Sequence, residues 1–338
     1  MVTIDKIRKP ITAELEEFDS FVRSQFSAEG DLLTEMLDYV FASRGKSIRP
    51  MIAMLAAGLV APERPVGKRT YLAAMLVEMI HVASLIHDDV IDESFLRRGR
   101  ASVNARWQSK NAVLVGDYIL ARNMDAGMSS GQYDIVAHVI KTIGQLCEGE
   151  ILQGDHSKKM DTTRADYLDI IYKKTASLIA VSASAGALSA RASYEKVSQM
   201  RRFGEALGMA FQIVDDILDY TAESSVTGKP ECGDLREHKI TLPLIEVLER
   251  ADESHRRELL EALAECSDDA SKIEFVSDAV KREGGVDRAR EVAKAYLQRA
   301  LSVLAAFPQS PYRDALTDLC TYVAERDTMT LQNSITKQ

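Results

Sequence analysis

The sequence predicts an all-α protein, and two observations favour this fold class. No proline lies between Pro65 and Pro230, so no residue in that span interrupts a helix by the proline mechanism. The span is also rich in Ala, Leu, Met, Ile and Glu, most of which favour helices, whereas alternating strand patterns between turn dipeptides are scarce.

The individual helices follow from the apolar periodicity and from the breaks between periodic segments. We expect them at 8–25, 31–44, 48–61, 66–93, 101–109, 111–128, 132–156, 163–189, 193–220, 240–250, 254–266, 270–283, 287–305 and 311–330. Small residues late in the 163–189 segment favour close helix packing. Residues 221–239 form one long polar loop, and such loops are often lids. No linker is evident, so residues 1–338 are interpreted as one domain, with roughly five N-terminal and eight C-terminal residues loosely held.

The composition narrows the classes of partner. The 338 residues carry a net charge of −9, which argues against nucleic acid. No apolar run reaches the ~18 residues of a membrane span, and the N-terminus lacks the apolar core of a signal peptide. The four cysteines are too far apart for a zinc knuckle and are interpreted as reduced thiols. The sequence therefore predicts a cytoplasmic protein.

Two aspartate clusters share the pattern D-D-x-x-D, in which helical geometry places the first and last carboxylates on one face. They comprise Asp88, Asp89, Asp92, Asp215, Asp216 and Asp219. Acidic runs on helices are usually solvated faces, but both clusters are embedded in apolar sequence, where carboxylates need a counter-charge. Carboxylates at this spacing suit Mg²⁺, which completes its shell with water and substrate phosphates. Two facing clusters would hold several metal ions around one diphosphate.

Cationic side chains accompany the clusters. Arg97 and Arg98 follow the first cluster, and arginine is shaped to bind phosphate. Lys46 and Arg49 stand three residues apart at a predicted helix start, and His81 lies two helical turns before the first cluster. The ordinary alternatives are solvated cations and a satisfied core histidine.

A second group of polar residues surrounds the later cluster. Lys174 and Thr175 are adjacent, and at a helix kink both could reach a phosphate. Gln212 lies three residues before the cluster and could hydrogen-bond into the same site. Lys229 and Lys239 bracket the long loop and could close over the cluster as the loop orders, although solvated loop charges are the alternative.

Five segments occur in a fixed order: GKSIRP, DDVIDESFLRRG, KKTASL, FQIVDDILDY and GKPECGDLREHKITLPL. Together they resemble the trans-prenyltransferase family, also called polyprenyl diphosphate synthases, over residues 36 to 250 and weakly over the helical C-terminus. The resemblance implies a single large bundle of helices around a central cavity, commonly dimeric. It also implies an enzyme that joins an allylic diphosphate to isopentenyl diphosphate with Mg²⁺, three ions when substrate is bound.

The resemblance assigns roles residue by residue. The metal ions are held by Asp88, Asp89, Asp92, Asp215, Asp216 and Asp219. Isopentenyl diphosphate is held by Lys46, Arg49, His81 and Arg98. The allylic diphosphate is held by Arg97, Lys174, Thr175, Gln212, Lys229 and Lys239. Of all these, the catalytic residues are Asp88, Asp92, Asp215, Arg97 and Lys174.

The chain departs from the family pattern at two motifs. The usual GGKRxRP reads RGKSIRP from Arg44 to Pro50, with one glycine and one arginine fewer, and both expected ligands remain. The usual DLREGK reads DLREHK, with His238 in place of glycine, which affects only the expected loop conformation.

Product length depends on the residues that precede the first cluster. The apolar tail is expected to run along the inner face of the 66–93 helix, where two small residues leave room for it. Nothing is inserted within the cluster, which resembles medium- and long-chain synthases. We expect an all-trans product of about six to ten isoprene units, with octaprenyl as the central expectation by resemblance. The chain-length residues are taken to be Ala83, Ser84, Met79 and Ile80.

Three alternatives stay open on the sequence. A geranylgeranyl or farnesyl diphosphate synthase would differ only in where elongation stops. A terpene cyclase usually carries an Asn/Ser/Glu metal motif in place of the second aspartate cluster. A non-catalytic helical subunit that binds a partner enzyme would be expected to have lost one cluster or the arginine pair, and this chain keeps them all.

Overall fold

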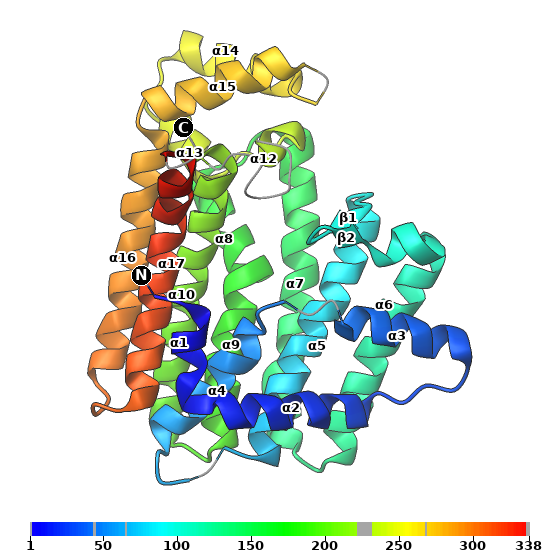
Figure 1. Ribbon diagram of the computed structural model, residues 1–338. Helices are drawn as coiled ribbons and strands as arrows, with labels where there is room; N and C mark the ends of the chain where they lie inside the picture. The colour runs from blue at the N-terminus through cyan, green and yellow to red at the C-terminus, as the bar shows by residue number, and fades with distance from the viewer. Residues whose placement is uncertain (1, 43–44, 65, 222–231, 268, 336–338) are drawn as a thin grey trace.

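The computed structural model describes residues 2–42, 45–64, 66–221, 232–267 and 269–335, without the side chains of 327–335. The described chain is almost entirely helical, as Figure 1 shows, and the predicted all-α fold is confirmed. The N-terminal elements are α1 (Ile4–Arg8), the 3₁₀ turn η1 (Lys9–Ile11), α2 (Thr12–Gln25), α3 (Asp31–Ala42) and α4 (Ile48–Val60). The central elements are α5 (Lys68–Ile91), β1 (Leu96–Arg97), β2 (Arg100–Ala101), α6 (Val103–Ser129), α7 (Tyr133–Lys159), α8 (Arg164–Ile171), the π-helical turn η2 (Tyr172–Ala176), α9 (Ser177–Ser189) and α10 (Tyr194–Thr221). The C-terminal elements are α12 (Gly233–Arg236), α13 (Leu242–Leu248), α14 (Glu253–Ala264), α15 (Ala270–Arg282), α16 (Gly285–Ala305) and α17 (Pro311–Ile335).

Helix α5 is the central element of the bundle. It packs against α4, α6 and α9, and residues 70–80 are all buried. Its length and mean hydropathy of 1.4 match a membrane span, but 78% of that window is buried inside the protein, as in a core helix. The burial agrees with an apolar sequence that has no polar face over three turns.

Small residues let α9 approach its neighbours closely, as its composition predicts. A side chain at Gly186 would collide with the backbone carbonyl of Ala53 in α4. A Cβ at Gly208 in α10 would lie 2.5 Å from Cα of Ala176, at the end of the π-helical turn. Helix backbones are therefore in direct contact on both sides of the segment formed by η2 and α9, which fixes the position of the π-helical turn.

The structure shows two interruptions in the central helices: the periodicity missed the one within 163–189, and it predicted the one near residue 110. The 163–189 segment is two α-helices joined by the π-helical turn η2, and such turns occur often at functional sites. Helix α6 spans both segments predicted at 101–109 and 111–128, and its backbone breaks at Gln108 (φ 71°, ψ 153°).

A short hairpin after α5 is missing from the predicted elements. Strands β1 and β2 pair antiparallel, with Arg97 opposite Arg100. The two residues between them, Arg98 (φ 54°) and Gly99 (φ 74°), both have left-handed backbone angles, as a tight two-residue hairpin loop requires. The hairpin returns the chain across the end of α5 and places Arg97 and Arg98 beside it.

The first and last helices of the described chain pack together. Helix α17 packs against α10, α16, α4 and α1, and Figure 1 shows α1 beside it. Nζ of Lys6 in α1 lies 2.9 Å from Oδ2 of Asp318 in α17. Helix α17 therefore forms one wall of the bundle next to α10. Helices α14 and α15 lie across one end of the bundle, as Figure 1 shows.

Candidate active site

One large cavity, of about 860 Å³, lies between α4, α5, the β1–β2 hairpin, the π-helical turn, α10 and α17. Most of the predicted site residues line it: Lys46, Arg49, His81, Ser84, Asp88, Asp89, Arg97, Arg98, Lys174, Thr175, Gln212 and Asp215. Asp88 from α5 and Asp215 from α10, which are 127 residues apart in the sequence, therefore face one hollow.

A smaller hollow, of about 160 Å³, adjoins this cavity, because Lys174, Thr175 and Gln212 line both. Asp216 and Lys239 also line the smaller hollow. Lys229 lies outside the described residues. The two hollows together bring most of the predicted diphosphate ligands to one region of the bundle.

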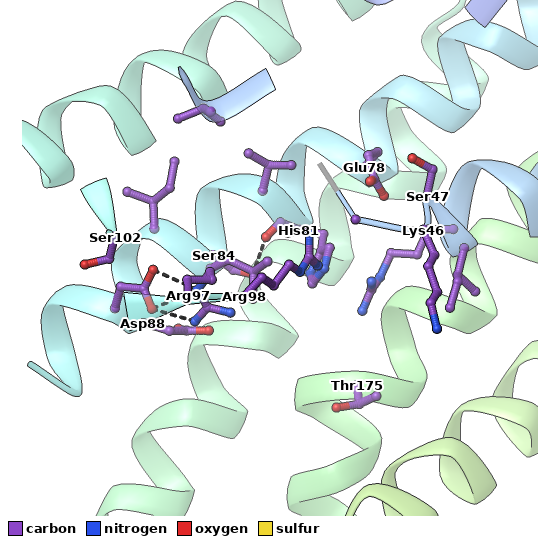
Figure 2. Close-up of a pocket in the computed structure, with 18 of the residues that line it drawn as sticks. Lys46, Ser47, Glu78, His81, Ser84, Asp88, Arg97, Arg98, Ser102 and Thr175 are labelled. Carbon is purple, nitrogen blue, oxygen red and sulfur yellow. Dashed lines mark hydrogen bonds and ion pairs between the residues drawn. The ribbon is translucent and has the colours of Figure 1, made fainter. Parts of the chain in front are cut away.

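The α5 wall of the cavity presents His81, Ser84 and Asp88 at intervals that place them on one helix face, as Figure 2 shows. Burial raises the pKa of Asp88 to about 6, and repulsion from Glu150 and Asp92 adds to the shift. Asp92 is the C-terminal cap residue of α5, and its pKa is raised, first by partial burial, although Lys239 opposes the shift. Burial and the neighbouring carboxylates therefore outweigh the effect of nearby cations on these two carboxylates.

The hairpin contributes two arginines to the same cavity. Asp89 is only 2% exposed, and both its oxygens accept hydrogen bonds from Nε of Arg97, at 2.8 and 2.7 Å. Nη2 of Arg97 lies 2.6 Å from Oδ1 of Asp89. The guanidinium of Arg98 lies against Gly45, where a side chain would collide with it. Asp89 thus holds Arg97 at the cavity, and the glycine leaves space for Arg98.

The predicted isopentenyl diphosphate ligands form a basic end of the cavity, where Figure 2 shows Lys46, His81 and Arg98 together. Burial lowers the pKa of Arg49 to about 10, against an opposite effect of the Glu78 carboxylate. Burial and the nearby guanidinium groups hold the pKa of His81 well below its ordinary value, so this imidazole is neutral at pH 7. Nζ of Lys46 donates a 2.6 Å hydrogen bond to the hydroxyl of Tyr322.

The π-helical turn directs both Lys174 and Thr175 into the site, as predicted for a helix kink. Nζ of Lys174 lies 2.6 Å from Oε2 of Glu150 in α7 and also contacts Gln153. The Thr175 hydroxyl donates a 2.6 Å hydrogen bond to Oε1 of Gln212 in α10. The turn therefore links α7 and α10 through side chains that have also been predicted to bind a diphosphate.

The three carboxylates of the second cluster have three different environments. Oδ1 of Asp215 lies 2.6 Å from Nη2 of Arg326, at the cavity wall. Asp216 accepts hydrogen bonds from the Tyr167 hydroxyl, at 2.6 Å, and from Nε2 of Gln212, at 2.8 Å. Burial, with repulsion from the Asp234 carboxylate, raises the pKa of Asp216 well above its ordinary value.

Asp219 caps the short helix α12. Its two oxygens accept hydrogen bonds from the backbone N–H groups of Gly233 and Asp234, each at 3.0 Å. The carboxylate therefore stabilises the chain that re-enters the site after α10, and it does not line the large cavity. Its metal role stays a prediction.

Lys239 and His238 follow α12. Burial lowers the pKa of Lys239, but the carboxylates of Glu237 and Asp234 raise it by more. The pKa of Lys239 is therefore above its ordinary value. His238, which replaces the family glycine, has a left-handed backbone (φ 54°), which explains why glycine suits this position. Its ring hydrogen-bonds the Ser267 hydroxyl at 3.0 Å.

The predicted chain-length residues are divided between the cavity wall and the core. Ser84 lines the large cavity, whereas Ala83, Met79 and Ile80 are at most 1% exposed and do not. The apolar part of the cavity is lined on α5 by Val82, Leu85 and Ile86. The expected path of the tail is therefore closed by packed side chains beyond this point, and its assignment stays a prediction.

Several residues at the site have no counterpart among the sequence predictions. Five of them line the hollows, and Glu150 contacts Lys174: Arg8, Glu78, Tyr167, Glu150, Tyr322 and Arg326. They come from α1, α5, α7, α8 and α17, and no motif marks them. Only the folded arrangement of the termini brings Arg8 and Arg326 to the same cavity.

The residues present fit divalent cations bound together with a diphosphate. Eight cationic side chains and four carboxylates line the cavity of a chain whose net charge is −9, so positive charge is concentrated there. Within the described residues, no three His, Cys, Asp or Glu side chains already form a metal site. Asp88 and Asp215 would each supply a ligand, and substrate phosphates would complete the shell, as is usual for Mg²⁺.

Comparison with known proteins identifies the family. The sequence family described as polyprenyl synthetase matches residues 30–280. The chain is 32% identical to the octaprenyl diphosphate synthase of Escherichia coli, over 96% of this chain and 100% of that protein. The fold is similar to the crystal structure of a decaprenyl diphosphate synthase from Rhodobacter capsulatus, with a TM-score of 0.89 and 33% identity over 96% of this chain and 99% of that one. It is also similar to the crystal structure of a polyprenyl synthase from Caulobacter crescentus complexed with calcium and isoprenyl diphosphate. That comparison has a TM-score of 0.89 and 30% identity over 96% of this chain and 98% of that one. The chain therefore belongs to the polyprenyl synthetase family and is a prenyltransferase.

Proposed function

We propose that the protein elongates an allylic diphosphate with isopentenyl diphosphate to an all-trans polyprenyl diphosphate of about six to ten isoprene units, with octaprenyl as the central expectation. The observation that carries the proposal is the shared cavity, in which Asp88 and Asp215 face one hollow lined by eight cationic side chains. This arrangement fits a reaction whose leaving group is a diphosphate.

The two ends of the cavity would bind the two substrates. Lys46, Arg49 and Arg98 would hold the diphosphate of isopentenyl diphosphate, and neutral His81 would hydrogen-bond it. The allylic diphosphate would lie between the aspartate clusters, close to Lys174 and Thr175. Asp89 would act by orienting Arg97 toward that diphosphate. Apart from Lys229, which lies outside the described residues, the roles assigned by family resemblance are kept as part of this proposal.

Divalent cations, expected to be Mg²⁺ and about three in number, would neutralise the departing diphosphate when bound. The chain's own groups would add to this electrostatic stabilisation, because Asp89 and Glu150 hold Arg97 and Lys174 at the cavity in which the diphosphate is proposed to leave. The allylic carbon–oxygen bond breaks, the double bond of isopentenyl diphosphate attacks the allylic carbon, and a proton leaves to the released diphosphate. The cavity contributes by holding both reactants in contact.

The remaining features of the proposal concern the whole chain. Residues 1–338 are proposed to form one domain that assembles as a homodimer. Among the residues with described side chains, twelve large hydrophobic ones are exposed, and half of these lie on α6 and α7, which supports an interface there. The four cysteines are all free thiols, which supports a reducing compartment such as the cytoplasm.

A single assay tests the proposed function. The protein is incubated with Mg²⁺, farnesyl diphosphate and labelled isopentenyl diphosphate, and the product is sized after removal of the diphosphate. Extension to a long chain is the expected result. A stop at a short chain would select a geranylgeranyl-type enzyme, and the absence of any extension would contradict the proposal. The Asp88→Ala variant should lose activity by orders of magnitude while its helical circular dichroism is unchanged.

A further inference from the structure

The wall of the cavity formed by α17 holds a cation to which the proposed function gives no role. Nη2 of Arg326 lies 2.6 Å from Oδ1 of Asp215, the first carboxylate of the second cluster. The guanidinium also lies over the ring of Phe211, 4.6 Å from its centroid. The two paired side chains are only 25% and 34% exposed, so water screens their attraction weakly.

The same face of α17 also contacts the other substrate site. Tyr322 precedes Arg326 by about one helical turn, and its hydroxyl accepts the 2.6 Å hydrogen bond from Nζ of Lys46. Both Tyr322 and Arg326 line the large cavity. Helix α17 therefore touches a proposed metal ligand with one side chain and a proposed isopentenyl diphosphate ligand with another.

We propose that Arg326 is an exchanging counter-ion of the active site, which pairs with Asp215 in the substrate-free enzyme and with the substrate diphosphate once a divalent cation binds Asp215. The inference rests on the proposed function, since it requires both a metal ion and a diphosphate in the cavity. It adds Arg326 to the binding residues and gives α17 a direct role in the site.

Electrostatics make the two partners of Asp215 compete. A carboxylate whose charge is already compensated by a guanidinium at 2.6 Å binds a divalent cation more weakly, and the two positive charges repel each other. A guanidinium displaced from Asp215 can bind another anion. A diphosphate in the same cavity supplies it, because arginine binds phosphate oxygens in pairs. Metal binding at Asp215 and diphosphate binding at Arg326 should therefore strengthen each other.

The test measures the binding of two simple ligands to the intact protein by calorimetry. In the Arg326→Gln variant, Mn²⁺ alone should bind about fivefold more tightly than in the natural protein, because one ion pair no longer competes. Inorganic pyrophosphate in the presence of Mn²⁺ should bind about tenfold more weakly, because a charged donor is lost. For both ligands, the Arg326→Lys variant should have an affinity between that of the natural protein and that of Arg326→Gln. A general loosening of α17 would weaken the binding of both ligands, so tighter Mn²⁺ binding together with weaker pyrophosphate binding is specific to the exchange.

Lys6→Gln is the matched control. It removes the ion pair with Asp318 that joins α1 to α17, but it removes no cation from the cavity, so both binding constants should stay unchanged. Mn²⁺ binding that is unchanged or weaker in Arg326→Gln would overturn the exchange. So would an Arg326→Gln effect on Mn²⁺ binding that persists when Asp215 is replaced by Asn.

The outcome separates this inference from the proposed function. If the natural protein fails to extend a prenyl primer, the proposed function is wrong whatever Arg326 does. If it extends the primer and Arg326→Gln leaves both binding constants unchanged, only the counter-ion exchange is wrong.

Discussion

The ionised carboxylate of Asp88, which the proposed chemistry requires, destabilises the folded protein above about pH 6. Burial and the neighbouring carboxylates raise its pKa from 3.8 to about 6. The folded protein therefore holds a proton at this site more tightly than the unfolded chain does. Its contribution to stability is complete below about pH 4 and is lost as the pH rises through about 6.

The Asp88→Asn variant should consequently be more stable than the natural protein at pH 8. We expect a gain of about 1–3 kcal/mol in the free energy of unfolding, since each unit of pKa shift corresponds to about 1.4 kcal/mol and the carboxylate is partly exposed. The gain should shrink to nothing near pH 4. Urea unfolding in metal-free buffer at both pH values measures this gain. Equal stabilities of the two proteins at pH 8 would contradict the raised pKa of Asp88.

Gly45 determines where Arg98 can lie. In the Gly45→Ala variant the new methyl group would occupy the position of the Arg98 guanidinium, which is the end of a flexible side chain and can move away at little cost to stability. KM for isopentenyl diphosphate should rise about tenfold with little change in kcat, as expected when uniform binding is lost. Gly154→Ala is the control, because a Cβ there meets nothing within 4 Å. An unchanged KM in the Gly45→Ala variant would indicate that Arg98 does not bind isopentenyl diphosphate.

Individual residues show where prediction from the sequence succeeded and where it could not. The positions of Asp88, His81 and Arg49 at one cavity followed from helix geometry and motif order. Motif order could not reveal that Asp219 caps α12, because the cap depends on where the chain returns after residue 231. Arg326 carries no local signal, since it reaches Asp215 only through the packing of α17 on α10.

At the scale of elements, the π-helical turn η2 depends on a glycine in a neighbouring helix. A Cβ at Gly208 would lie 2.5 Å from Cα of Ala176, and backbone cannot move aside as a side chain can. Gly208→Ala should therefore cost about 1–3 kcal/mol of stability by overpacking. It should also raise KM for the allylic diphosphate, because Lys174 and Thr175 are displaced. Thermal unfolding and steady-state kinetics measure the two effects, and Gly144→Ala, which faces open space, should show neither.

Helix α5 is expected to set the product length. Ala83 is fully buried and does not line the cavity, so the predicted tail path along α5 requires the packed side chains there to move as the product grows. A tyrosine at this position would block that path. The Ala83→Tyr variant should release shorter products than the natural protein, as measured by chromatography of the dephosphorylated prenols. An unchanged chain length in a folded and active variant would place the tail elsewhere.

Helix positions were predictable because long apolar periods and proline-free sequence dominate this chain, and α10 and α15 begin and end within a residue of their predicted ranges. The break at Gln108 lies within two residues of the interruption predicted between 109 and 111. The π-helical turn was not predicted, because it lies where the α10 backbone meets Ala176, and local periodicity does not report such a contact between helices. The β1–β2 hairpin is too short, at two residues per strand, to produce a period.

At the scale of the whole molecule, α6 and α7 present apolar side chains that a single chain leaves exposed. Leu114 on α6 is 56% exposed and Ile140 on α7 is 45% exposed. If these helices form the proposed dimer interface, Leu114→Glu combined with Ile140→Glu should convert the protein to a monomer in sedimentation velocity. Leu301→Glu on α16 changes an exposed leucine away from these helices and should leave the dimer intact. A natural protein that sediments as a monomer would contradict the proposed assembly.

The account depends most on the claim that the two aspartate clusters act on one diphosphate. A crystal structure with Mg²⁺ and a non-reactive thio analogue of farnesyl diphosphate tests it directly. We predict electron density for metal ions that join the analogue's phosphates to Asp88 on one side and to Asp215 on the other, with Arg326 moved from the carboxylate to the diphosphate. An analogue bound with its phosphates away from either aspartate would contradict the account.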